Sequence, residues 1–308
     1  MRLNDRLRHR TSRLIGQGFS NQNDRVLSAV GELQCKVSSL LPPKGLNDAE
    51  FSIFSQWGED GIIQHLLATV EILEPVFVEI GVGDYSECNT RFLATQSNWS
   101  GLAVDMRSDH VDLISRKELD WRYGIEAVVE TVTAGNINQL LRDRGVSRDL
   151  GLLSIDVDGQ DYWIFSAIEE VDPRIVVIEY NAVFGDEHAV TVPRAVDAAL
   201  AYRDPTGIWF GASLPALVTR ATEKGYVFVG CESHGANAFF VRRDLAEGLP
   251  TPSLTDGFRP SRFRTSRSES GSLDLEPSRT AKLRRVERLP LVELPGHRQT
   301  TVGEVFGL

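Results

Sequence analysis

The feature that most restricts the fold of this chain is the alternation of short apolar segments with helical patterns. Each apolar segment is five or six residues long and rich in β-branched side chains, as expected for strands whose two faces are buried in a parallel sheet. The predicted strands are 76–80, 101–105, 127–132, 152–156 and 175–179, and the predicted helices between and after them are 87–97, 108–119, 136–144 and 161–170. Such βαβ units predict a doubly wound, mostly parallel α/β sheet.

The end of this region follows a different pattern. Two further apolar segments, 226–229 and 238–241, flank a loop that contains Gly235 and Asn237. Two short strands around a turn-rich loop predict an antiparallel hairpin that completes the sheet.

Composition changes at both ends divide the chain into three parts. Residues 1–45 are predicted to form a helical extension, because Phe19, Val26, Val30, Leu33, Val37 and Leu40 recur at spacings of three, four or seven before Pro42 and Pro43 break the pattern. This stripe either covers the main domain or joins two copies of the chain as a homodimer. Residues 46–248 form the α/β domain, and residues 249–308 are polar, rich in Ser, Arg and Pro, and predicted to be a partly disordered tail.

Charge and hydropathy restrict the partners and the compartment. A net charge of −10 disfavours nucleic acid or an anionic membrane surface as the main partner. No apolar run approaches the roughly 18 residues that a membrane span requires, and the basic N-terminus lacks the apolar stretch of a secretory signal. The three widely spaced cysteines are typical of a reducing compartment and fit no zinc site, so we expect a cytoplasmic protein.

The first predicted strand ends in a glycine turn. Glu79-Ile80-Gly81-Val82-Gly83 lets the backbone approach a ligand closely, but Ser86 stands where a dinucleotide fingerprint has its third glycine. Asp105 ends the second strand about 20 residues further on, where an acid accepts hydrogen bonds from ribose hydroxyls. The combination favours a nucleoside ligand without a pyrophosphate. Ala134, after the third strand, is small enough to leave room for a flat base.

Polar side chains follow the fourth and fifth strands. Asp156 and Asp158 come after one strand, and Glu179 and Asn181 end or follow the next. Ligands of open α/β sheets lie outside the carboxyl ends of the strands, so we expect these groups to converge there. One alternative is that a divalent cation bridges these carboxylates, because oxygen ligands favour Mg²⁺, Mn²⁺ or Ca²⁺ over zinc. The other is that one acid anchors a loop and another binds the cofactor's amino group.

Two histidines are candidates for removing a proton from a substrate near neutral pH. His188 follows the fifth strand and His234 lies in the hairpin loop. Each has the alternative of being an ordinary surface side chain. Together with the two acids that follow the fourth strand, His188 completes the set of predicted catalytic residues, which are Asp156, Asp158 and His188.

These motifs, in this order, resemble FkbM-like S-adenosylmethionine-dependent methyltransferases. The resemblance covers about residues 51–243. The motifs that carry it are Phe54-Ser55-Gln56-Trp57-Gly58-Glu59-Asp60-Gly61, the glycine turn, Ile155-Asp156-Val157-Asp158-Gly159, Gly211-Ala212-Ser213-Leu214 and Gly235-Ala236-Asn237-Ala238. In the third of these motifs Asp158 stands where the family usually has Glu. It implies a Rossmann-like class I methyltransferase fold with a seven-stranded sheet.

The resemblance also implies roles for individual residues. Glu79, Gly81 and Gly83 would hold the methionine end of S-adenosylmethionine, and Asp105 its ribose. Gln56 and the Glu59-Asp60 pair would lie over the cofactor pocket. The placement of Asp156, Glu179 and Asn181 is also similar to that of the metal ligands in divalent-metal O-methyltransferases.

The resulting hypothesis is an enzyme that transfers a methyl group to a hydroxyl of a sugar, glycan or natural-product metabolite. In one alternative the chain is a non-catalytic cofactor-binding or scaffold protein, which the acid cluster disfavours. In another it is a nicotinamide-dependent oxidoreductase, which the missing third glycine disfavours.

Overall fold

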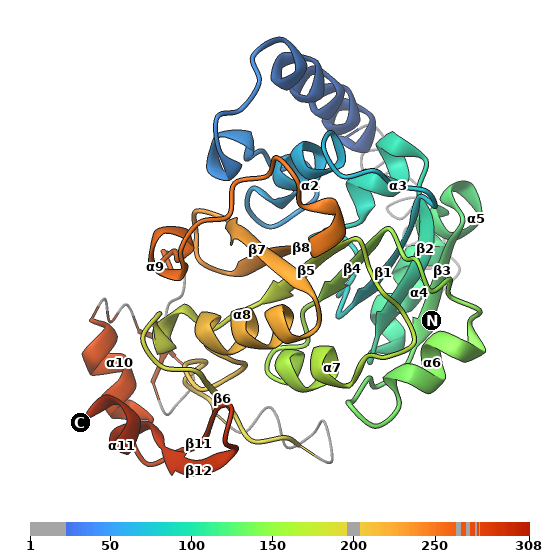
Figure 1. Ribbon diagram of the computed structural model, residues 1–308. Coiled ribbons are helices and arrows are strands. Elements are labelled where there is room, and N and C mark those ends of the chain that lie inside the picture. The colour runs from blue at the N-terminus through green and yellow to red at the C-terminus, as the bar shows by residue number, and fades with distance from the viewer. Residues whose placement is uncertain (1–22, 196–203, 263–265, 269–271, 275, 277) are drawn as a thin grey trace, which may run out of the picture.

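The structure, a computed structural model, describes residues 23–195, 204–262, 266–268, 272–274, 276 and 278–308. Its centre is a seven-stranded sheet with helices on both faces (Figure 1). The strand order is β3-β2-β1-β4-β5-β8-β7. Residues 1–22, including the predicted stripe residue Phe19, lie outside the described part of the chain.

Neighbouring strands from β3 to β5 run parallel, as the repeated βαβ pattern predicts. The remaining two form the predicted hairpin, with β8 antiparallel to β5 and β7 antiparallel to β8. The strands are β1 Val76–Ile80, β2 Ser100–Asp105, β3 Ile125–Val129, β4 Leu152–Ile155, β5 Ile175–Glu179, β7 Tyr226–Cys231 and β8 Asn237–Arg242. The doubly wound α/β fold is therefore confirmed.

The third strand is displaced from its prediction. It was expected at 127–132 and lies at β3 Ile125–Val129, because its partner β2 ends at Asp105, which pairs with Val129. Residues 130–132 extend beyond the end of β2, so they have no partner strand there and leave the sheet.

Two layers of helices bury the sheet. Two hydrophobic clusters, one on each face of the sheet, join it to these helices. Helices α2, α3 and α4 pack on one face, and α6, α7 and α8 pack on the other. Their bounds are α2 Glu59–Leu67, α3 Arg91–Ser97, α4 Ser108–Arg116, α5 Leu119–Tyr123, α6 Ile137–Asp143, α7 Asp161–Ala167 and α8 Leu214–Glu223. The helix predicted at 108–119 ends earlier, because Glu118 has a φ of +59° and separates α4 from α5.

Alternation along the strands places three polar side chains on the same face. Phe77, Val177 and Phe239 pack with the helices of the α2–α4 face. Side chains two residues apart on a strand share a face. Glu79, Glu179 and Asn237 therefore lie on the α2–α4 face, near the carboxyl ends of β1 and β5 and the start of the antiparallel β8.

An N-terminal helix covering 23–40 and a 3₁₀ turn at η1 Leu46–Ala49 precede the sheet. The helix contacts the domain through Asp24, whose carboxylate pairs with the buried Arg91 guanidinium at 2.6 Å, and through the buried Gly31. The helical extension is thus present in the described part of residues 1–45, and it lies against the α2–α4 side of the molecule (Figure 1).

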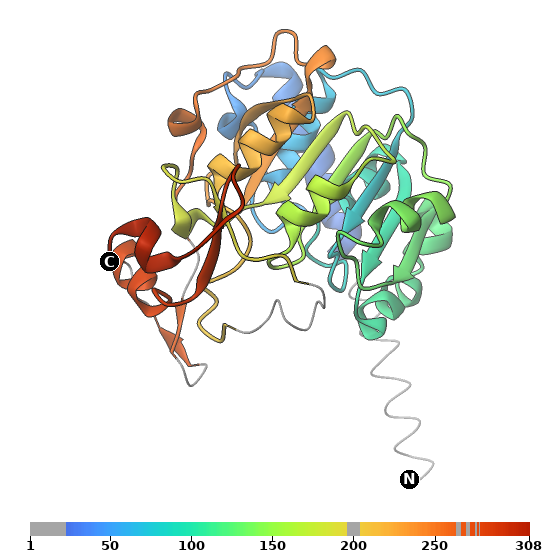
Figure 2. The same cartoon turned by 60° about the horizontal axis from the view of Figure 1, so that its bottom comes forward.

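The C-terminal region differs from its prediction. The segment 249–308 was expected to be a partly disordered tail, yet its described residues form α9 Leu254–Gly257, β9 Ser266–Arg267, β10 Leu273–Asp274, α10 Arg279–Arg285, β11 Pro290–Glu293, β12 Arg298–Thr301 and α11 Val302–Phe306. Strand β11 pairs with β12 and with β6 Val190–Thr191, which precedes the predicted boundary at 248. Figure 2 shows α10, α11, β11 and β12 gathered at one end of the molecule.

A separate hydrophobic cluster explains this difference. It joins Val183, Phe184 and Val190 to Leu283, Leu291 and other apolar residues of the C-terminal elements. Apolar residues are sparse in 249–308, so average composition predicts disorder, but they pack against an apolar surface of the α/β domain.

Among the described residues, no helix is both long and apolar enough to cross a membrane.

Candidate functional site

The glycine turn after β1 closely approaches the loop after β4. Gly81 has a φ of +89°, and a Cβ atom there would lie 1.5 Å from the carbonyl oxygen of Asp156. Gly83 has a φ of +55°, and a Cβ atom there would have no atom within 4 Å. The first glycine is required for packing, whereas the second borders open space that a ligand can occupy.

Asp105 is joined to this turn. Its Oδ2 accepts a hydrogen bond from the Gly83 amide at 2.8 Å, and its Oδ1 accepts one from the Arg107 amide at 2.8 Å. The Nδ1 of His110 lies 3.3 Å from Oδ1. Oδ2 therefore has a second lone pair that is suited to a ribose hydroxyl, whereas Oδ1 has His110 beside it as well as the Arg107 amide. The structure therefore brings together the two features that the sequence paired.

Glu79 holds the segment before α3. Its oxygens accept hydrogen bonds from the Asn89 amide at 2.7 Å, the Thr90 amide at 3.1 Å and the Thr90 hydroxyl. Burial raises the pKa of Glu79 to about 7. Glu79 thus contacts protein groups directly. It can influence a ligand at the glycine turn only by positioning Asn89 and Thr90.

The loop 53–60 encloses two more buried acids. Asp60 Oδ2 accepts the amides of Ile53, Phe54 and Ser55 at 2.7, 2.7 and 2.9 Å, whereas its Oδ1 is buried without a hydrogen-bond partner. Burial raises the pKa of Asp60 to about 6. Gln56, predicted to lie over the pocket, is exposed in the same loop.

Glu59 connects this loop to the hairpin. Its oxygens accept the Trp57 amide at 2.9 Å and the Asn237 amide nitrogen at 2.8 Å. Asn237 lies opposite Glu179 in the register of β5 and β8, and its Oδ1 is buried without a hydrogen-bond partner. Neither Glu232, in the hairpin, nor Asn237 was chosen from the sequence as a site residue. The hairpin pattern placed Asn237 in the loop, whereas it begins β8 and the pairing register puts it beside Glu179.

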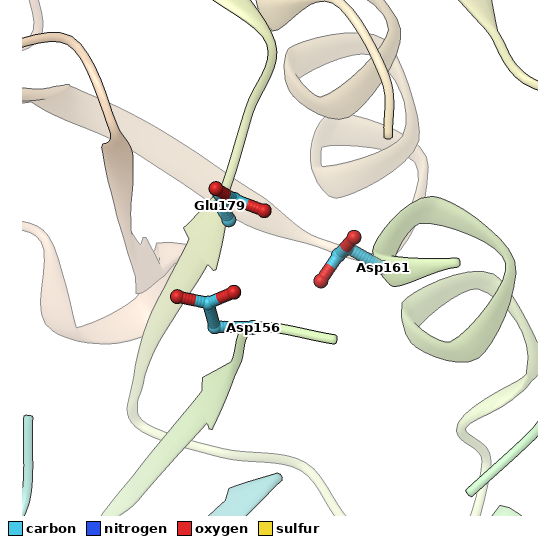
Figure 3. Close-up of side chains that lie close together, drawn as sticks. All are labelled: Asp156, Asp161 and Glu179. Atoms are coloured by element: carbon cyan, nitrogen blue, oxygen red, sulfur yellow. The ribbon is translucent and has the colours of Figure 1, made fainter. Parts of the chain in front are cut away.

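Three carboxylates converge beyond the ends of β4 and β5. One oxygen each from Asp156, Asp161 and Glu179 lies within 4.8 Å of the others, and Figure 3 shows the side chains turned toward a common space. Asp161 also accepts the Val157 amide at 2.8 Å and the Gly159 amide at 3.0 Å, and burial raises its pKa to about 6. It combines loop anchoring with a place in the cluster.

Asn181 is engaged by neighbouring protein groups. Its Nδ2 donates to the carbonyls of Ile208 and Phe210 at 2.8 and 3.0 Å, and its Oδ1 accepts the Val183 amide at 3.0 Å. Through this last bond it caps η2 Ala182–Phe184. The third acid beside Asp156 and Glu179 is Asp161. The signal for it was its place at the start of a helix in the same acidic loop.

The candidate proton acceptors lie in different places. Asp158 is exposed in the loop after β4, with a φ of +53°. The His188 ring packs edge-on against Phe306 of the C-terminal helix, with centroids 5.5 Å apart. The His234 ring instead stacks on Trp57 of the loop 53–60 at 4.1 Å. Of the two histidines, His234 is the one packed against the loop that holds Glu59 and Asp60.

The turn after β3 contains Ala134, which is half-buried. The side chain of Asn136, the residue before α6, bonds to Thr133 and Thr131 and makes no cap hydrogen bond to α6. It therefore closes the turn that carries Ala134.

No family model matches this chain, and no curated protein matches it. Among solved structures, it is similar to an O-methyltransferase from Bacillus cereus in complex with SAH, with 19% identity, 54% of this chain and 72% of that chain covered, and a TM-score of 0.33. It is also similar to the N-terminal domain of EvdMO1 with SAH bound, with 12% identity, 68% and 94% coverage and a TM-score of 0.39. A third is an S-adenosylmethionine-dependent methyltransferase from Clostridium acetobutylicum, with 12% identity, 59% and 89% coverage and a TM-score of 0.36.

The sheet has the strand order β3-β2-β1-β4-β5-β8-β7, with β8 antiparallel to both of its neighbours. This is the Rossmann-like arrangement of the class I methyltransferase fold.

Proposed function

We propose that this chain is an S-adenosylmethionine-dependent O-methyltransferase acting on a hydroxyl of a sugar, glycan or natural-product metabolite. The observation that carries the proposal is the open space beside Gly83, next to Asp105 and to a group of buried acids. The resemblance of the sequence motifs to FkbM-like methyltransferases supports the same conclusion.

The buried acids favour a cationic ligand. Burial, with a smaller contribution from neighbouring acids, raises the pKa values of Asp60, Glu79 and Glu232 to about 6, 7 and 7, because their charged forms are poorly solvated. A positive charge nearby would stabilise those charged forms. S-adenosylmethionine carries a sulfonium and an amino cation, so its charge complements this side of the sheet, whereas a phosphate-bearing ligand would be repelled.

The residues of the turn fit the rest of such a cofactor. The space at Gly83 permits close approach of a ligand to the backbone. The remaining lone pair on Oδ2 of Asp105 would accept a hydrogen bond from a ribose hydroxyl, and Ala134 would leave room for the base. When bound, S-adenosylmethionine supplies an electrophilic methyl group.

The chain must then orient the acceptor hydroxyl and remove its proton. Asp156, half-buried just after β4 and with its carbonyl against Gly81, would hold the hydroxyl beside the turn. Asp158, in the same loop, and His188 remain candidates for the proton acceptor. His234 is an additional candidate because it stacks on Trp57 beside the loop 53–60.

Assistance by a divalent metal is a further part of the proposal. Asp156, Asp161 and Glu179 present oxygen ligands within 4.8 Å of one another, a donor set suited to Mg²⁺. Asp161 retains one lone pair on each oxygen for this purpose. A bound cation would lower the pKa of a coordinated hydroxyl and fix its direction.

The first test is calorimetric titration of the folded protein with S-adenosylhomocysteine, with and without Mg²⁺. We expect micromolar binding, and Asp105→Asn should weaken it about tenfold or more through loss of a ribose hydrogen bond to a charged group. Asp109→Asn, at an exposed acid on α4, is the matched control and should bind like the wild type. Absence of binding under both conditions would reject the cofactor class and leave a scaffold role as the better interpretation.

Turnover separates an enzyme from a binding protein. With saturating cofactor and a panel of sugar and polyketide hydroxyl acceptors, Asp156→Asn should lose methyl transfer while it retains S-adenosylhomocysteine binding. Unchanged turnover in this variant would exclude the assigned role of Asp156. Binding of a nicotinamide dinucleotide in place of S-adenosylhomocysteine would favour the oxidoreductase alternative.

A further inference from the structure

The N-terminal helix directs its apolar stripe away from the domain. The exposed fractions of Val26, Leu33 and Leu40 are 63%, 61% and 79%, and those of Val30 and Val37 are 43% and 42%. Leu27 and Leu41, exposed by 37% and 72%, extend the stripe on one side. A continuous apolar stripe of this kind is unusual on a monomer and indicates a contact surface.

The orientation of the helix is determined by contacts on its opposite side. Asp24, Ser28, Gly31, Cys35 and Ser38 are the less exposed positions, and they recur at the three- and four-residue spacing of a second helix face. A Cβ atom at Gly31 would lie 2.4 Å from the ring of the buried Phe92, and Asp24 pairs with the buried Arg91. Rotating the helix to bury its apolar stripe would break this ion pair and force side chains into Phe92.

The residue types on the stripe follow a heptad rule. With Val30 and Val37 assigned to position a, Val26, Leu33 and Leu40 occupy position d. Valine at a with leucine at d favours a parallel two-stranded coiled coil. Asn23 also falls at an a position, where asparagine specifies two strands in register at some cost in stability.

The charges of the helix permit association with an identical copy. Residues 23–40 contain Asp24, Arg25, Glu32 and Lys36, so this segment is neutral although the chain carries −10 overall. Lys36 is already paired with Glu32 at 2.6 Å on its own helix. No like charges therefore face each other along the seam of a symmetric pair.

We propose that a second copy of this chain covers the stripe, and that the two N-terminal helices form a parallel, in-register coiled coil. An isolated coil of this length would be marginal in water. Here each helix is already held on its domain by Asp24 and Gly31, so association has less ordering entropy to overcome. The proposal is independent of the catalytic activity.

Sedimentation of the full chain tests this directly. We expect a dimer at about 10 µM, and the double variant Leu33→Lys with Val37→Lys should raise the dimer dissociation constant about 100-fold or more. The control Glu32→Gln with Ser39→Lys adds the same net charge at exposed positions off the stripe and should remain dimeric. A monomeric wild type, or a stripe variant that remains a dimer, would overturn the proposal.

Cross-linking tests the geometry without depending on a disruptive variant. In a parallel, in-register pair the two Val37 side chains face each other, so Val37→Cys should form an intermolecular disulfide readily. Ser39→Cys, exposed on the same helix but pointing away from the seam, should cross-link much more slowly. Equal rates for the two variants would contradict an in-register coil.

Discussion

At the scale of single residues, the two glycines of the turn after β1 have different tasks. Both have positive φ angles, which side chains other than glycine rarely adopt. Gly81 is pressed against the Asp156 carbonyl, whereas Gly83 faces open space and donates its amide to Asp105. Packing therefore requires the first glycine, and under the proposed function the second lets the cofactor approach the backbone.

Alanine substitutions should separate these tasks. Gly83→Ala should cost about 1–2 kcal/mol of folding free energy, from the backbone conformation alone, while it weakens S-adenosylhomocysteine binding. Gly81→Ala should cost more, because its Cβ atom also overlaps the Asp156 carbonyl. Urea unfolding and calorimetry of the two variants check this. Equal losses of stability would show that the clash at Gly81 is relieved by movement of the loop after β4.

At the scale of elements, the C-terminal strands and helices are part of the main body. Strand β11 hydrogen-bonds to β6, and Leu291 of β11 is fully buried in a cluster that includes Val183, Phe184 and Val190. Leu273 of β10 is 66% exposed. The same residue type thus supports the fold at one position and contributes little at the other.

A pair of leucine substitutions tests this difference. Leu291→Ala should lower the free energy of unfolding by about 2–5 kcal/mol, because it removes buried methylenes and leaves a cavity. Leu273→Ala, the matched control, should change it by less than about 0.5 kcal/mol. Chemical unfolding monitored by tryptophan fluorescence measures both. Similar small effects would mean that residues 249–308 fold apart from the domain.

At the scale of the whole molecule, an acidic chain buries several of its acids together. Burial raises the pKa values of Asp60, Glu79, Asp161 and Glu232, to between about 6 and 7. The folded protein therefore retains protons that the unfolded chain has released above pH 4.5. Since the folded state binds more protons in this range, the free energy of unfolding must fall as the pH rises from about 4.5 to 7.

Glu79 provides the test. A pKa raised from 4.5 to about 7 corresponds to a loss of about 3 kcal/mol between pH 4.5 and 8. Glu79→Gln should reduce the slope of stability against pH by about one proton, whatever constant cost the substitution has. Glu87→Gln, at an exposed position nearby, should leave the slope unchanged. Urea unfolding at several pH values distinguishes the two, and an unaltered slope in Glu79→Gln would refute the assigned proton.

Local patterns in the sequence were enough to predict the central sheet. Strands 76–80 and 175–179 were predicted at their observed bounds, because continuous apolar runs of this length are buried on both sides whatever surrounds them. The pairing of Gly83 with Asp105 was also predictable, since consecutive parallel strands place their carboxyl ends side by side. Sequence spacing is sufficient to predict such contacts when elements that are consecutive in the sequence also lie side by side in the fold.

Contacts between residues far apart in the sequence were decided by the tertiary structure. It brought Asp161 beside Asp156 and Glu179, and it gave the side chain of Asn181 carbonyl partners at Ile208 and Phe210. It placed Asn237 opposite Glu179 through a pairing register between distant strands. It also turned the stripe of the N-terminal helix outward, because Gly31 fits against Phe92 where a larger side chain would not. Each outcome reflects a competition between long-range contacts that the linear sequence does not rank.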